Sequence, residues 1–169
     1  GPFPEHYEPL EGPLAKNPLS SQRMNPAAEI FKSDMDKVAN ASEKFPYVCT
    51  TYSCTEHWCT GALTRWQAWL LEMQPELYLE IGDELAKEKG IKNGERIKVS
   101  SIRGEAPCIA MVTKRFKPFH VEGKTVHQVG MPFNYGWLFP KDSTSDSTNM
   151  LTPTVGDANT FCPEYKAFM

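Results

Sequence analysis

The chain has 169 residues, of which 40% are hydrophobic and 23% are charged, and its formal net charge at pH 7 is -3. This length and composition are typical of one globular domain with an additional arm. A slightly negative chain without a basic run is a poor candidate for nucleic-acid binding. No apolar stretch approaches the roughly 18 residues of a membrane-spanning helix, so no direct membrane span is predicted.

The chain contains five cysteines, and an odd number argues against a closed disulfide framework. Free thiols are therefore expected. No signal peptide is recognisable, and the chain opens on Gly1 rather than Met. We expect a processed chain or a fragment of a longer protein.

Residues 1–44 are predicted to form an extended, proline-rich arm or linker before a globular domain at 45–169. Prolines recur through the first 26 residues with glycine and polar residues between them. Proline fixes φ and disfavours helix at the preceding residue. The arm is therefore expected to be coil that wraps a surface or links domains.

Hydrophobic periodicity predicts six strands and two helices in the globular part. The predicted strands are 45–52, 77–81, 96–101, 106–113, 124–130 and 165–169. The first predicted helix spans 62–73, with Thr60 as its N-cap and with Trp66 and Trp69 assigned to the core. Asp83 is expected to cap the second helix, which Gly90 ends.

This pattern predicts a mainly β fold with inserted helices. Arg103 and Gly104 lie between two predicted strands and are expected to form the turn of a hairpin. The first and last predicted strands lie at opposite ends of the globular part. A closed barrel would pair them and remove the exposed edges.

The polar loop between the first strand and the first helix is the most informative stretch. It carries hydroxyl groups at Ser53, Thr55 and Thr60, together with His57. Backbone N–H groups at a helix N-terminus have no partner within the helix, and the helix dipole favours anions there. The loop is therefore predicted to bind the pyrophosphate of a cofactor.

Three other interpretations of this loop stay open. Cys54, His57 and Cys59 could hold zinc, although no second pair of ligands lies elsewhere in the chain. His57 beside Glu56 could be a general base, although no nucleophile motif accompanies it. His57 could also be a structural residue. A Walker loop and a G-x-G-x-x-G motif are both absent, so a Rossmann-type nucleotide site is not supported.

The segment 148–166 is rich in Asn, Thr and Asp. It could be an ordered loop built from Asx and Ser/Thr turns, or a second wall of donors and acceptors facing a polar heterocycle. Gly136, within Asn134-Tyr-Gly-Trp137, would let a ligand approach the backbone.

Several motifs resemble one enzyme family over nearly the whole chain. The stretch ELYLEIGDELAKEKGIKNGERIKVSSIRGE, which begins at Glu76, is similar to a domain of the molybdopterin-dependent oxidoreductases. The segments TTYSCTEHWCTG, NMLTPTVGDANTFCPEYK and GPFPEHYEPLEGPLAKNPL resemble the large catalytic subunit of formate dehydrogenases. Ser53 departs from the pattern, because many relatives carry Arg at that position.

The resemblance implies a double-psi six-stranded β-barrel that binds two molybdopterin guanine dinucleotides, which hold molybdenum or tungsten through their dithiolenes. The implied reaction is the two-electron oxidation of formate to carbon dioxide. No catalytic residue and no metal ligand is assigned to this chain. The candidate cofactor-binding residues are Ser53, Glu56, His57, Trp58, Cys59, Thr60, Asn134, Gly136, Asn149, Glu164, Tyr165 and Lys166.

The resemblance also implies what the chain works with. The metal-ligating selenocysteine or cysteine and the iron–sulfur cluster would lie in the remaining domains of the catalytic subunit. An iron–sulfur electron-transfer subunit and a periplasmic location are expected, and the chain alone is expected to have no turnover. Two alternatives stay open: another molybdopterin oxidoreductase, acting on nitrate, polysulfide or dimethyl sulfoxide, and a stand-alone double-psi barrel that serves as a binding module.

Overall fold

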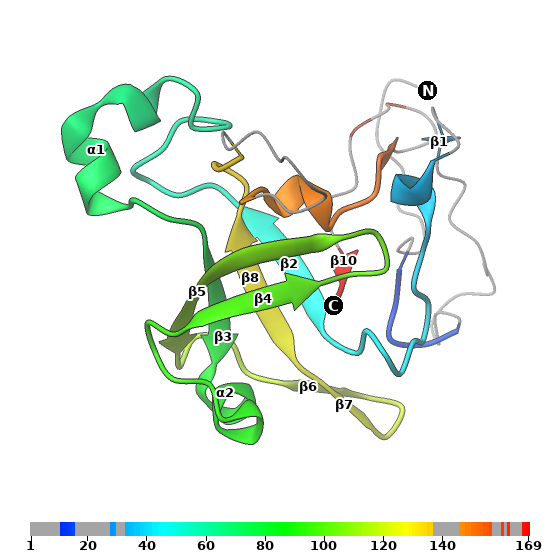
Figure 1. The fold of residues 1–169 in the computed structure, drawn as a ribbon. Coiled ribbons are helices and arrows are strands. Elements are labelled where there is room, and N and C mark those ends of the chain that lie inside the picture. Colours follow the sequence, from blue (N-terminus) through cyan, green and yellow to red (C-terminus); the bar gives the residue numbers. More distant parts are fainter. Residues whose placement is uncertain are drawn as a thin grey trace.

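A computed structural model describes residues 11–15, 28–29, 33–136, 146–156, 160, 162 and 167–169. Their main element is a mixed six-stranded sheet with a few short helices around it (Figure 1). The strands of this sheet are β2 (Val48–Tyr52), β3 (Tyr78–Gly82), β4 (Arg96–Ser100), β5 (Glu105–Thr113), β8 (Gln128–Pro132) and β10 (Ala167–Phe168). No helix among the described residues is long and apolar enough to cross a membrane.

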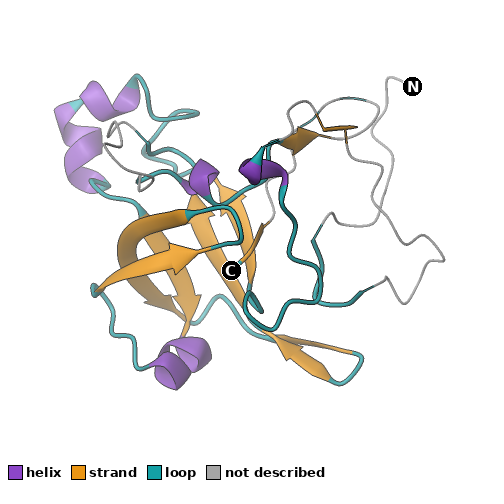
Figure 2. Ribbon diagram, turned by 45° about the vertical axis from the view of Figure 1, so that its right-hand side comes forward, coloured by secondary structure: helices purple, strands orange, loops and turns teal. Residues whose placement is uncertain are grey.

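The sheet has the strand order β10-β2-β8-β3-β5-β4. Figure 2 shows the strands of this sheet together, with the helices at its periphery. The predicted hairpin is confirmed, because β4 and β5 pair antiparallel. The predicted contact between the first and last strands is also confirmed, with Ala167 opposite Cys49. Two small antiparallel pairs lie outside the sheet: β1 (Ala28–Glu29) with β9 (Val155–Gly156), and β6 (Phe119–Val121) with β7 (Lys124–Val126).

Alternation of side chains builds the core on the inner face of β5. Ala106, Cys108 and Ala110 are buried, whereas Pro107 and Met111 between and beyond them are exposed. Successive residues of a strand point to opposite faces, so this pattern places one face of β5 on the core. In the central strand β3, by contrast, four successive residues are buried.

The second predicted helix is confirmed as α2 (Asp83–Lys89), which begins one residue early with Gly82 as its N-cap. Gly90 ends it with φ +68°, as predicted. The first predicted helix is wrong at its start. A 3-10 turn, η2 (Thr64–Trp66), precedes the six-residue helix α1 (Ala68–Met73), and Gln67 rather than Thr60 occupies the N-cap position.

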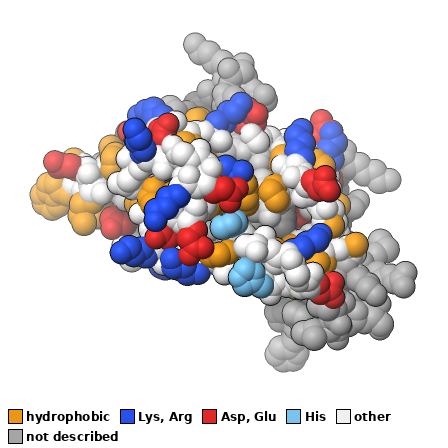
Figure 3. All heavy atoms as spheres, turned by 90° about the horizontal axis from the view of Figure 1, so that it is seen from below, with side chains coloured by type: hydrophobic (Ala, Val, Ile, Leu, Met, Phe, Trp, Pro, Cys, Tyr) orange, Lys and Arg blue, Asp and Glu red, His pale blue; other side chains and the backbone are white. Residues whose placement is uncertain are grey.

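Two of the predicted core residues are also wrong. The exposed fractions of Trp66 and Trp69 are 78% and 83%. The α1 region projects away from the sheet in Figure 1, and Figure 3 shows hydrophobic side chains gathered at the same end of the molecule. Their spacing predicted a buried face, but the described residues contain nothing that buries it.

The predicted strand 124–130 divides at His127 into β7 and β8, and the prediction missed β6. The remaining helical turns are η1 (Asp34–Asp36) and η3 (Thr148–Met150). Ser33 caps η1 through a capping box. Its hydroxyl accepts from the N–H of Met35, and its own backbone N–H donates to the carboxylate of Asp36.

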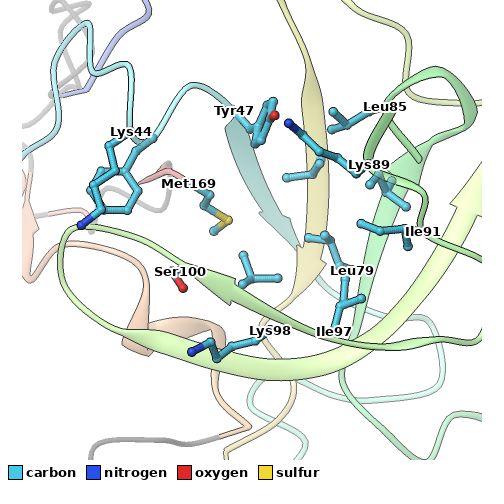
Figure 4. A pocket seen from close by; sticks show the side chains of 14 residues that line it. Lys44, Tyr47, Leu79, Leu85, Lys89, Ile91, Ile97, Lys98, Ser100 and Met169 are labelled. Atoms are coloured by element: carbon cyan, nitrogen blue, oxygen red, sulfur yellow. The ribbon is translucent and has the colours of Figure 1, made fainter. Parts of the chain in front are cut away.

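The sheet curves strongly, but the pairings among the described residues do not close it into a ring, because they end at β4 and β10. An apolar cavity of about 340 Å³ lies between these edges (Figure 4). Ile97 and Val99 of β4 line one side of it, and Tyr47 and Met169 line the other. Paired strands lie only about 5 Å apart, so β4 and β10, with this cavity between them, are not paired with each other.

A buried ion pair holds the described part of the arm against the globular residues. Both Nη atoms of Arg103 donate to the carboxylate of Glu11, at 2.7 and 3.0 Å, and both side chains are fully buried. Arg103 also donates to the carbonyls of Leu151 and Lys37, and Glu11 accepts from the N–H of Ala39. The domain boundary at residue 45 stays a prediction.

Candidate functional site

The predicted cofactor loop, residues 53–61, follows the carboxyl end of β2, and Asn134 fixes its shape. The side-chain oxygen of Asn134 accepts from the N–H of Cys54 at 2.7 Å. Its amide nitrogen donates to Ser53 Oγ at 3.0 Å and to the carbonyls of His57 and Cys59. Asn134 is fully buried. The side-chain amide of Asn134 therefore makes its hydrogen bonds to the loop itself.

His57 is likewise bound inside the chain. Its Nε2 lies 2.8 Å from the carbonyl oxygen of Gln74, and its Nδ1 lies 3.2 Å from Thr64 Oγ1. Thr64 Oγ1 also accepts from the N–H of Trp58. Because a carbonyl oxygen can only accept, Nε2 carries a proton and donates to Gln74. The imidazole therefore links the loop to the end of α1.

Two residues of the loop have positive φ, namely Cys59 at +46° and Gly61 at +75°. A Cβ atom on Gly61 would lie 2.2 Å from the carbonyl oxygen of Asn134. Turns of this kind direct successive N–H groups to one side and form anion-binding concavities. Position 61 requires glycine because the backbone of Asn134 passes directly over it.

Replacement of Gly61 by alanine should therefore disrupt the loop, with a loss of roughly 2–4 kcal/mol in the free energy of unfolding from combined steric and φ strain. Gly94 is a matched control, because its φ is +79° and a Cβ there would meet nothing within 4 Å. Gly94→Ala should cost about 1 kcal/mol. Urea denaturation of both variants measures the difference, and equal losses would show that Asn134 does not constrain the loop.

The loop leaves hydrogen-bond donors available at its surface. In the part of the chain that the structure describes, the backbone N–H groups of Thr55, Glu56, Cys59 and Thr60 bond to no acceptor. Thr55 and Thr60 are exposed, and so is Ser53, although its hydroxyl donates to the carbonyls of Cys54 and His57 within the loop. Free N–H groups and hydroxyls in one short turn are the donors that phosphate oxygens accept. The donor set therefore fits an anionic group.

Residues that sequence reasoning missed support this loop. The side chain of Thr64 holds Trp58 and His57, and Tyr135 donates to the same Gln74 carbonyl at 3.0 Å. The guanidinium carbon of Arg65 lies 5.4 Å from the centre of the Tyr135 ring. Partial burial lowers the pKa of Arg65, and the charge of Asp146 opposes this shift. Local sequence carries no signal for a contact such as that between residues 65 and 135.

Arg65 also packs against the loop. Its Nε would lie 2.9 Å from a Cβ on Gly61. An arginine at this place supplies positive charge next to the exposed N–H groups. Arg65 is therefore a candidate for the positive charge that an anionic group at this loop would meet.

The other candidate residues are placed unevenly. Asn149 is exposed on η3. Gly136 has φ +125°, and a Cβ there would meet the side chain of Ser147 at 3.0 Å, so Ser147 is what approaches its backbone. Glu164, Tyr165 and Lys166 lie outside the described residues, although β10, which follows them, pairs with the strand that leads into the loop.

The three candidate zinc ligands of the loop do not form a metal-binding cluster. The Cys54 thiol lies 3.6 Å from the hydroxyl of Tyr78, His57 is bonded as described, and Cys59 is exposed. Among the described residues, no group of three His, Cys, Asp or Glu side chains could hold a metal ion.

All five cysteines are free thiols, as expected. Burial raises the pKa of Cys108 to about 12 and also raises the pKa values of Cys49 and Cys54. Because the thiolate is the reactive form, a thiol reagent at pH 8 should modify only the exposed Cys59 and Cys162 of the folded chain. Titration before and after denaturation should give two and then five equivalents. Five fast equivalents in the folded chain would contradict the buried placements.

The chain is similar to the alpha or major subunits of several formate dehydrogenases. It is 58% identical over 168 residues to "Formate dehydrogenase 2 subunit alpha (cytochrome c-553)" of Nitratidesulfovibrio vulgaris, covering 99% of this chain and 16% of that protein. It is 47% identical over 169 residues to "Formate dehydrogenase subunit alpha" of Megalodesulfovibrio gigas, covering 100% and 16%. It is 46% identical over 175 residues to "Formate dehydrogenase, nitrate-inducible, major subunit" of Escherichia coli, covering 100% and 16%. The chain thus spans about a sixth of the length of these relatives.

Two further comparisons concern the domain itself. "Acetylene Hydratase from Pelobacter acetylenicus" has a similar fold, with a TM-score of 0.55 and 11% identity, covering 74% of this chain and 18% of that one. The family described as "Molydopterin dinucleotide binding domain" matches residues 47–169, which include the sheet and the loop. The chain belongs to the molybdopterin dinucleotide-binding domain family.

Proposed function

We propose that this chain is the cofactor-binding domain of a formate dehydrogenase catalytic subunit. The observation that carries the proposal is the Asn134-clamped loop with its available N–H groups, in a chain that belongs to a dinucleotide-binding family. Identity of 46–58% to formate dehydrogenase subunits supports formate as the substrate over nitrate, polysulfide or dimethyl sulfoxide. We also propose the finer fold: a double-psi barrel preceded by a proline-rich arm.

When bound, a molybdenum or tungsten bis-pterin centre supplies the two-electron chemistry, and this chain binds and orients the dinucleotide. The backbone N–H groups of Thr55, Glu56, Cys59 and Thr60 would hold the pyrophosphate. Ser53, whose hydroxyl donates within the loop, stays a candidate contact. Asn134 and His57 set the loop geometry rather than contact the ligand. Trp58, Gly136, Asn149 and the segment Glu164-Tyr165-Lys166 stay candidate contacts to the cofactor.

The first predicted helix was expected to help bind phosphate through its dipole. Because the helical pattern begins only at Thr64 and α1 only at Ala68, the loop's own N–H groups carry this role. Arg65 adds the positive charge that a slightly acidic chain must place locally against a polyanion. We propose that the chain works together with the remaining domains of the subunit and with an iron–sulfur electron-transfer subunit. We also propose a periplasmic location.

A single added charge tests the phosphate loop. In the full catalytic subunit, Thr60→Glu places a carboxylate among the proposed phosphate donors and should lower molybdenum or tungsten content at least tenfold, because like charges repel. Thr60→Gln, of similar size but neutral, should retain most of the metal. Equal metal content in the two variants would refute phosphate binding at this loop.

Arg65 gives a second test. Arg65→Gln should lower cofactor retention by about 10- to 100-fold, because it removes one charge-assisted hydrogen bond worth about 1.5–3 kcal/mol. Arg65→Lys keeps the charge without the planar fork and should fall between wild type and Arg65→Gln. Dialysis followed by metal analysis measures retention. A lysine variant as weak as the glutamine variant would show that packing on Tyr135 matters and that the charge does not.

A further inference from the structure

The segment between β2 and β3 displays an apolar surface that we call the aromatic tip. It consists of Leu63, Trp66, Trp69 and Met73, whose exposed fractions run from 67% to 83%. Aromatic side chains each bury 150–250 Å² when covered, so the tip offers on the order of 600 Å² of apolar surface. That equals the largest patches found on soluble monomers, and such patches mark interaction sites.

The helix within the tip needs something to pack against. α1 has six residues, none of its residues is buried, and no side chain caps its N-terminus. Isolated helices shorter than about 12 residues are marginal in water, and most helices in proteins depend on packing of one face. Within the described residues, α1 lacks that packing, although its base is fixed to the loop through His57 and Gln74.

The composition of the tip matches a permanent interface. Between residues 58 and 74 the charged residues are Arg65 and Glu72. Interface cores are depleted of charge and enriched in aromatic residues and Met. A membrane-surface segment would instead carry several Lys or Arg residues beside its apolar face. The charge pattern therefore favours a protein surface as the occupant.

We infer that the aromatic tip is covered by another part of the same polypeptide, outside the 169 residues. The relatives carry this chain as about a sixth of one longer subunit, so a covalently attached surface is present at high effective concentration. The area on offer suits an interface between domains of one chain. This inference does not depend on phosphate binding by the neighbouring loop.

Radical footprinting of the full catalytic subunit tests the inference. Oxidation rates of Trp66, Trp69 and Met73 are read by mass spectrometry and compared with the same residues in the urea-denatured subunit. Full burial predicts at least tenfold protection, whereas the exposed fractions of 67–83% given by this chain alone predict less than about twofold. Less than twofold protection in the native subunit would overturn the inference.

The identity of the occupant is tested on the catalytic subunit purified without companion subunits and shown to be monomeric. Protection should persist there. A photo-reactive residue at Trp69 should cross-link to peptides of the same chain outside the 169 residues, and one at the exposed Lys87 of α2 serves as the control for random contacts. Protection that requires a companion subunit, a second copy or lipid vesicles would overturn the inference.

Discussion

Replacement of Arg103 by methionine should lower the free energy of unfolding by about 4 kcal/mol, because it leaves the Glu11 carboxylate buried without its partner. The guanidinium also satisfies the Leu151 and Lys37 carbonyls, which would lose a donor. Three segments far apart in sequence meet at this one side chain. Urea denaturation of the chain at pH 7 measures the loss.

The matched control is the exposed pair of Arg96 and Glu76, whose N–O distance of 2.8 Å is close to that of the buried pair. Arg96→Met should cost less than about 1 kcal/mol, because an exposed pair gains little in water. The double variant Arg103→Met with Glu11→Leu should regain a large part of the loss, since no unpaired charge remains. Equal losses for Arg103→Met and Arg96→Met would contradict the buried placement of Glu11.

Replacement of Asn134 by alanine should cost about 3 kcal/mol and should release the loop as well. The change leaves the N–H of Cys54 and the carbonyls of His57 and Cys59 without their partner, and unsatisfied buried groups carry most of this cost. In the full subunit, metal content should fall together with stability. Denaturation and metal analysis measure the two effects.

Asn93 provides the comparison for Asn134. Its side chain accepts one bond, from the N–H of Val112 at 2.9 Å, in an exposed turn. Asn93→Ala should therefore cost no more than about 1 kcal/mol and leave metal content unchanged. Retention of metal in a folded Asn134→Ala subunit would separate the clamp from cofactor binding and would count against the proposed role of the loop.

Sequence predicted the strands well because alternation of apolar residues reports which face of a strand is buried. β5 shows this at Ala106, Cys108 and Ala110. The hairpin and the stop at Gly90 were predictable because each depends on local backbone preferences. The start of the first helix was not predictable. The hydroxyl of Thr64 contacts His57 and the N–H of Trp58, and nothing in the sequence near Thr60 indicates these contacts.

Long-range contacts limited the prediction of the site. The order of residues 53–60 indicated an anion loop, but the same residues gave no sign that Asn134, about 80 residues away, shapes it. The pairing of Glu11 with Arg103 spans 92 residues and could not be inferred from either neighbourhood. For Trp66 and Trp69, helical spacing correctly indicated an apolar helix face. It could not indicate what covers that face, and both side chains are exposed in this chain.

The central claim is that the loop clamped by Asn134 holds the phosphates of a pterin dinucleotide. A structure of the holo catalytic subunit tests it most directly. Phosphate oxygens of the cofactor should lie about 3 Å from at least two of the backbone nitrogens of Thr55, Glu56, Cys59 and Thr60, with the Asn134 bonds intact. Phosphates bound elsewhere in the subunit, with these nitrogens facing solvent or protein, would contradict the claim.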